Sequence, residues 1–190
     1  MNIPVFIQTL SILIWLMPPI KQYKTQYFTF FLVLALSDPI IYSVYLIFSI
    51  PTLNFYPIMT LLLIISLSDR KKYYLWIVDS LIILIITYIF QNDPIRLFDF
   101  CIILFSVVLY QIINKLLQMI IQQKYLNLFL CLLLFYALLN ELKFISISLN
   151  LYQGSVSYYL ATFIQIFFGI SFSFITINTK NISISSKIKL

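Results

Sequence analysis

The sequence contains no histidine, only two glycines and two cysteines, and few charged residues, which make up 9% of its 190 positions. Without histidine, the usual zinc and haem sites and histidine-dependent acid–base catalysis are excluded. Cys101 and Cys131 each stand alone in an apolar run, with no CxxC or metal-ligand spacing. No glycine-rich phosphate loop, GxSxG elbow or HExxH helix occurs either. We therefore expect no metal, no cofactor, no catalytic residue and no enzymatic activity.

Apolar residues dominate what remains. They make up 62% of the chain, whereas about 45–50% is usual for a soluble domain. A transmembrane helix needs about 20 apolar residues, and seven such runs use most of the length. We predict an all-α integral membrane protein with one domain of about seven transmembrane helices (1–177) and a short polar, basic tail (178–190). The runs cover about 3–20, 28–50, 53–67, 74–90, 97 onward, 125–149 and 155–177.

The basic residues fix the expected orientation of these helices. Ten of the twelve Lys and Arg residues fall in the connections after the first, third and fifth runs or in the tail, whereas the alternate connections hold only Arg96 and Lys143. Lys and Arg are retained on the cytoplasmic side, so we expect the N-terminus outside and the C-terminus on the cytoplasmic or matrix side. The third run is short, and the prediction depends on its crossing fully. The ten residues are Lys21, Lys24, Arg70, Lys71, Lys72, Lys115, Lys124, Lys180, Lys187 and Lys189.

The net charge of +6 does not indicate nucleic-acid binding. The basic residues stand singly or in short clusters at helix ends, where they contact anionic lipid headgroups. The expected partners are therefore the lipid bilayer and other membrane-protein subunits, with no nucleic acid. We expect the chain to lie in an energy-transducing membrane, either a bacterial cytoplasmic membrane or an organellar inner membrane.

Two polar residues are expected near the middle of the bilayer. Asp38 lies about eleven residues into the second run, or roughly 16 Å at about 1.5 Å per residue. Gln165 lies about ten residues into the seventh run, which enters from the other side, so both residues can share one depth. A charged side chain at this depth costs at least about 2.5–3.5 kcal/mol. A proton- or cation-linked site with Pro39 loosening the helix is one interpretation. A neutral Asp38 that fixes helix packing through a hydrogen bond to Gln165 is the other.

A second polar group is expected near the outer surface, at the start of the fifth run and the end of the sixth. Adjacent helices would bring opposite charges together there, such as Arg96 with Glu141 or Asp99 with Lys143. The group is either an outward-facing pocket for a small polar ligand or a set of interfacial ion pairs with snorkelling side chains. Its members are Arg96, Asp99, Asn140, Glu141 and Lys143.

Two functions follow from these observations. The first is a non-enzymatic accessory, scaffold or sensor-like subunit of a larger membrane assembly, since catalytic residues are missing and few polar groups lie inside the runs. The alternative is a small secondary transporter, proton- or ion-coupled, with Asp38 as its coupling residue at the midplane.

Overall fold

The computed structural model describes residues 3–68, 73–149, 155–177 and 182–183, and this part of the chain is almost entirely helical. The predicted basic cluster at 70–72 and most of the predicted tail at 178–190 lie outside the described residues. The helical elements are α1 (Ile3–Trp15), α2 (Met17–Lys21), α3 (Phe28–Phe48), η1 (Thr52–Phe55), α4 (Tyr56–Leu67), α5 (Tyr73–Phe90), α6 (Pro94–Gln123), α7 (Leu128–Ser148) and α8 (Ser155–Phe174). A short antiparallel pair joins β1 (Tyr125–Leu126) to β2 (Ile182–Ser183).

These helices confirm the helical prediction and follow the seven apolar runs. Because α1 continues into α2 and η1 into α4, the described helices form seven rods. Among the described residues, α3, α6 and α7 are long and apolar enough to cross a membrane. A helix of 21 residues, such as α3 or α7, is about 30 Å long, which is the thickness of the hydrocarbon core. The fold is therefore compatible with a membrane location.

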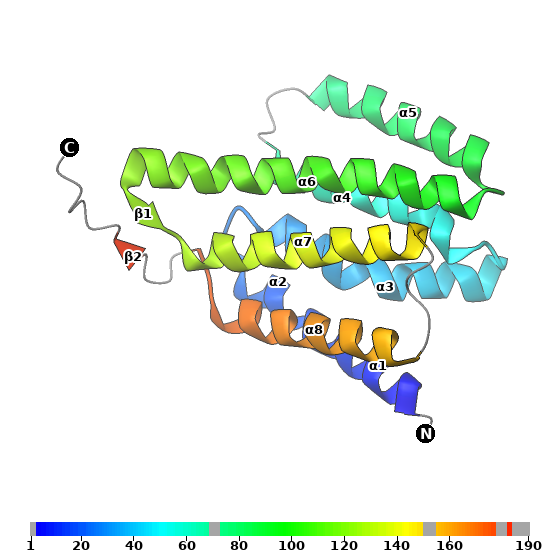
Figure 1. The fold of residues 1–190 in the computed structure, drawn as a ribbon, viewed down its shortest axis with the longest axis horizontal. Coiled ribbons are helices and arrows are strands. Elements are labelled where there is room, and N and C mark those ends of the chain that lie inside the picture. The colour runs from blue at the N-terminus through cyan, green and yellow to red at the C-terminus, as the bar shows by residue number, and fades with distance from the viewer. Residues whose placement is uncertain (1–2, 69–72, 150–154, 178–181, 184–190) are drawn as a thin grey trace.

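Six of the rods close into a ring. Around this ring, α1 packs on α3, α3 on α4, α4 on α6, α6 on α7, α7 on α8, and α8 on α1 and α2. The remaining helix, α5, lies outside the ring against α4 and α6 (Figure 1). Most of its outward side chains are exposed and apolar, including Leu81, Ile85 and Ile89.

The rods run in alternate directions, so the bundle has two distinct ends (Figure 1). The end near Ile3, which we call the N-terminal end, also holds η1, the turn between α5 and α6, and the last turn of α7. The other end, which we call the basic end, holds Lys21, Lys24 and Lys124. Lys115 also points toward this end, with Nζ 5.6 Å from the centre of the Tyr27 ring.

Two close contacts hold the last helix against the first. Gly169 of α8 lies so near α1 that a Cβ atom there would stand 2.8 Å from Cγ2 of Ile14. At the basic end the buried Gln22 side chain donates hydrogen bonds to the carbonyls of Phe172 (3.3 Å) and Ile175 (3.0 Å). Phe172 lies in the last turn of α8, where carbonyls have no partner within the helix, and Ile175 directly follows that helix. Together, the two contacts close the ring of helices and provide hydrogen-bond donors for the carbonyls at the end of α8.

Aromatic rings fill the ring of helices between its middle and the basic end. Phe172 of α8 lies at the centre, 4.9 Å from the Phe31 ring and 5.7 Å from the Phe129 ring, measured between centroids. Edge-to-face and tilted arrangements of this kind add to the stability gained from burial. We call this set the aromatic cluster, and its members are Trp15, Tyr27, Phe31, Phe129, Tyr136, Phe168 and Phe172.

We predict that Phe172→Ala lowers the free energy of unfolding by about 3–5 kcal/mol, because it leaves a cavity at the centre of this cluster. Phe172 is fully buried, whereas Phe174, two residues along the same helix, is 76% exposed. Phe174→Ala is the matched control and is expected to change the stability by less than about 0.5 kcal/mol. Unfolding in mild detergent, followed by tryptophan fluorescence, gives both values. Equal losses for the two variants would contradict the assignment of Phe172 to the core.

Candidate functional site

A cavity of about 380 Å³ lies inside the ring of helices. Its lining residues come from α1, α3, η1, α4, α6, α7 and α8, and none comes from α5. It extends from Trp15 and Tyr136, which belong to the aromatic cluster, to Thr52 of η1 at the N-terminal end. The cavity therefore occupies the half of the bundle nearer that end, and the aromatic cluster separates it from the basic end.

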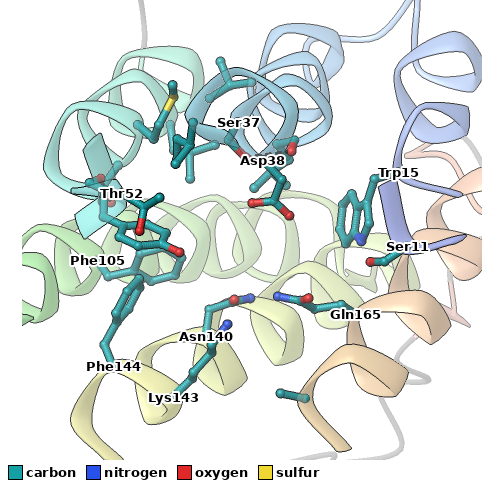
Figure 2. Close-up of a pocket in the computed structure, with 18 of the residues that line it drawn as sticks. Ser11, Trp15, Ser37, Asp38, Thr52, Phe105, Asn140, Lys143, Phe144 and Gln165 are labelled. Atoms are coloured by element: carbon teal, nitrogen blue, oxygen red, sulfur yellow. Dashed lines mark hydrogen bonds between the residues drawn. The ribbon is translucent and has the colours of Figure 1, made fainter. Parts of the chain in front are cut away.

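Asp38 and Gln165 both line this cavity, from opposite walls (Figure 2). Asp38 lies midway along α3 and remains accessible to water-sized molecules. Gln165 is half-buried on α8. The structure thus brings the two residues to one space, as their predicted depth suggests. Among the described residues, however, no hydrogen bond joins Asp38 to Gln165, so the suggested packing bond between them is not present.

The backbone beside Asp38 is weakened by proline. Pro39 lies inside α3 and has no amide hydrogen, so the carbonyl of Ala35, four residues earlier, loses its helical partner. Ser37 and Ser43 donate hydrogen bonds to the carbonyls of Leu34 (2.9 Å) and Pro39 (2.8 Å). The Asp38 side chain therefore lies where α3 lacks one backbone hydrogen bond and where serine side chains bond to backbone carbonyls.

Asn140 and Lys143 join Asp38 and Gln165 at the cavity. They lie three residues apart on α7, and Figure 2 shows both on the wall that faces Asp38. Residues at this spacing share one face of a helix. Asn140 is held in place by the hydrogen bond that its Nδ2 donates to the Tyr136 carbonyl (2.8 Å).

The rest of the predicted outer group faces elsewhere. Arg96 forms an ion pair with Asp93 at 3.1 Å on the exposed end of α6. Glu141 accepts a hydrogen bond from Ser106 (2.6 Å), and Asp99 accepts one from Ser148 (2.5 Å). The expected pairs of Arg96 with Glu141 and Asp99 with Lys143 are thus replaced by other partners among the described residues. Consecutive helical residues point about 100° apart, so Glu141 and Asn140 cannot share a face.

Asp38 and Lys143 are residues of opposite formal charge, but they do not meet. Among the described residues, no ion pair within 4 Å and no hydrogen bond engages either charged group. The two groups still influence each other electrostatically across the cavity. A water molecule takes about 30 Å³ in the liquid, so the cavity has room for about a dozen. Hydration of this kind is the condition under which two separated charges persist inside the bundle.

One side of the cavity is lined by aromatic rings. Phe144 of α7 lies at its centre, with ring centroids of Tyr56, Phe98 and Phe105 at 5.9, 6.4 and 5.7 Å. All four residues line the cavity. Sequence reasoning missed this wall, since an aromatic residue in an apolar run gives no sign of facing a cavity rather than lipid or a core. The site therefore combines a polar side with an apolar one.

A second cavity, of about 270 Å³, lies between α7 and α8. Its lining includes Leu139, Leu142 and Leu160, whose side chains are exposed on the outside of the bundle. It shares part of its lining with the first cavity, namely Tyr136, Asn140, Lys143, Ala161 and Gln165. The polar site thus adjoins a gap in the helix ring.

Comparison of the chain with protein-family models, curated proteins and solved structures finds no match. The described residues also contain no group of three or more side chains suited to holding a metal ion. The groups that line the cavity therefore indicate what it can bind. One carboxylate, one ammonium, two amides and an aromatic wall are groups that bind and orient a small molecule.

We predict that Lys143→Gln changes the free energy of unfolding by less than about 1 kcal/mol, because Asp38 keeps its hydration when Lys143 is removed. Breaking a buried ion pair in direct contact costs about 3–5 kcal/mol instead. Lys21→Gln, at the exposed basic end, is the matched control. The measurement is unfolding in mild detergent without added ligand. A loss of about 3–5 kcal/mol for Lys143→Gln alone would contradict a separated, hydrated pair.

Proposed function

We propose that the protein is a small secondary transporter that binds a polar solute in the cavity, with Asp38 as its coupling residue. The observation that carries this proposal is the juxtaposition of Asp38, Asn140, Lys143 and Gln165 around one cavity inside the bundle. Its volume of about 380 Å³ falls in the range of small-molecule sites, about 300–1,000 Å³. Ionisable groups inside a membrane domain mark solute and ion pathways by default.

The arrangement of the breaks and the aromatic cluster suits alternating access. Transporter sites are typically formed by interrupted helices near the midplane. Here the first rod is interrupted between Trp15 and Met17, close to Pro18, and α3, although continuous, lacks one backbone hydrogen bond at Pro39. Both positions adjoin the cavity or the aromatic cluster. We propose that the structure represents the state closed toward the basic end, and that movement of the first rod and α3 opens that end.

Asp38 supplies the coupling in this proposal. An Asp that faces a cavity is ionised when protons are scarce and neutral when it has taken one up. Solute and proton then bind from one side and leave toward the other, driven by the proton gradient. Lys143 keeps the site electrically balanced while Asp38 is charged.

The orientation of the chain is part of the proposal. Seven crossings, with the N-terminus outside and the basic end on the cytoplasmic or matrix side, follow from the distribution of Lys and Arg. The alternating directions of the described rods are consistent with this arrangement. In it, the cavity faces outward, and uptake is driven inward across an energy-transducing membrane.

The role as an accessory subunit of a larger assembly stays a prediction. The exposed apolar faces of α3, α5 and α6 suit lipid tails as well as a neighbouring subunit. The cavity is the observation that favours the transporter over this role, because a purely structural subunit has no need of a charged, hydrated space within its bundle.

We predict that Asp38→Asn abolishes proton-coupled uptake while leaving the fold intact, because Asn cannot exchange a proton. The purified protein is reconstituted in liposomes that contain a pH-sensitive dye. Small amino acids, amines, carboxylates and sugars are then added outside the liposomes in turn. Proton influx that follows one of these additions identifies the coupled solute.

Asp99→Asn is the matched control, since Asp99 lies on the exposed end of α6 and bonds to Ser148. It is expected to retain full proton influx. A stable, correctly inserted Asp38→Asn protein with unchanged influx would remove Asp38 from the coupling role.

A further inference from the structure

We infer that the solute is a small zwitterion, with one cationic and one anionic group on the same molecule and an apolar side group. This inference rests on the proposed function and names the substrate class of the same cavity. Its starting point is that Asp38 and Lys143 present opposite charges to one space from opposite walls without pairing with each other (Figure 2).

A zwitterion satisfies both charges at once. A solute with a single cationic group would pair with Asp38 and displace water from Lys143, leaving that ammonium desolvated without a partner. A solute with a single anionic group would do the same to Asp38. Once the solute has displaced the water, an uncompensated charge of this kind is strongly unfavourable. The site therefore selects a ligand whose two charges are complementary to its own.

The neutral groups of the site fit the same ligand. Asn140 lies on the helix face of Lys143, and Gln165 stands on the neighbouring helix. Their amides can hydrogen-bond a carboxylate or an ammonium group and hold its direction. The Phe144 wall, with Tyr56, Phe98 and Phe105, offers an apolar surface for a side group. An α-amino acid with an aliphatic or aromatic side chain has this combination of groups.

Three matched probes test the inference on the full chain in mild detergent. L-phenylalanine carries both charges, L-phenylalaninamide carries only the cation, and N-acetyl-L-phenylalanine carries only the anion. L-leucine and L-alanine are measured beside them to cover smaller side groups. Calorimetric titration is run at about pH 6, where α-amino groups are protonated. We expect the preferred zwitterion to bind at least tenfold more tightly than either singly charged relative.

Two variants assign the two charges. Asp38→Asn should remove the preference for L-phenylalanine over its N-acetyl derivative while keeping the preference over the amide. Lys143→Gln should do the reverse. Glu141→Gln is the matched control, because Glu141 is next to Asn140 in sequence but bonds to Ser106 away from the cavity. It should leave all preferences unchanged.

The outcomes separate this inference from the proposed function. Zwitterion binding with the expected effects of both variants supports the inference, and if no uptake accompanies it, the transporter proposal alone fails. Coupled uptake of a sugar or a singly charged solute, with no binding of any zwitterion tested, overturns the inference and leaves the transporter standing. Equal binding of the three phenylalanine probes, or preferences unaffected by Asp38→Asn and Lys143→Gln, also overturns it.

Discussion

The contact between the last helix and the first is the interaction on which the rest of the structure depends. Gly169 allows α8 to approach Ile14 of α1 more closely than a side chain would permit. The buried Gln22 side chain then donates hydrogen bonds to two carbonyls at the end of α8. Without this closure, α1, α3, α4, α6, α7 and α8 would form an open sheet of helices and enclose no space. In a chain with two glycines, one of them is therefore placed where a close helix approach requires it.

Closure of the ring creates two interiors with opposite character. Toward the basic end, aromatic rings pack around the fully buried Phe172 in tilted and edge-to-face arrangements. Toward the N-terminal end, the same ring encloses a cavity with a carboxylate, an ammonium and two amides. A charge is expensive in lipid, and the cavity has room for the water that makes a charge tolerable. The proposed function follows from this division, because a site that is hydrated on one side and sealed on the other is one state of an alternating-access cycle.

Much of the fold was predictable because apolar runs and breakers are local signals. The ranges 28–50, 74–90 and 125–149 differ by at most a few residues from α3, α5 and α7, since each ends at proline or a polar turn. The placement of Asp38 and Gln165 at one cavity was likewise predictable, because the level of a residue along a helix follows from counting residues at a known rise.

Facing direction and helix order were harder to predict. The sequence places Asn140 and Lys143 beside Glu141. In a helix, however, adjacent residues point about 100° apart, so sequence distance does not show which of them face the cavity. The exclusion of α5 from the ring and the adjacency of α1 and α8 depend on contacts between residues far apart in the chain. Nothing in an apolar run specifies these neighbours, because every outward face of such a helix suits lipid and protein alike.

In the transporter proposed above, water reaches the site between Asp38 and Lys143 from the N-terminal end only. The test uses Asn140→Cys in a protein whose Cys101 and Cys131 are replaced by alanine. The new thiol is probed with a small, charged thiol reagent that does not cross membranes. The reagent is added outside sealed vesicles that hold the protein in one orientation or the other. We expect reaction in vesicles that expose the N-terminal end and protection in those that expose the basic end. Protection in both orientations, or reaction only from the basic end, would contradict it.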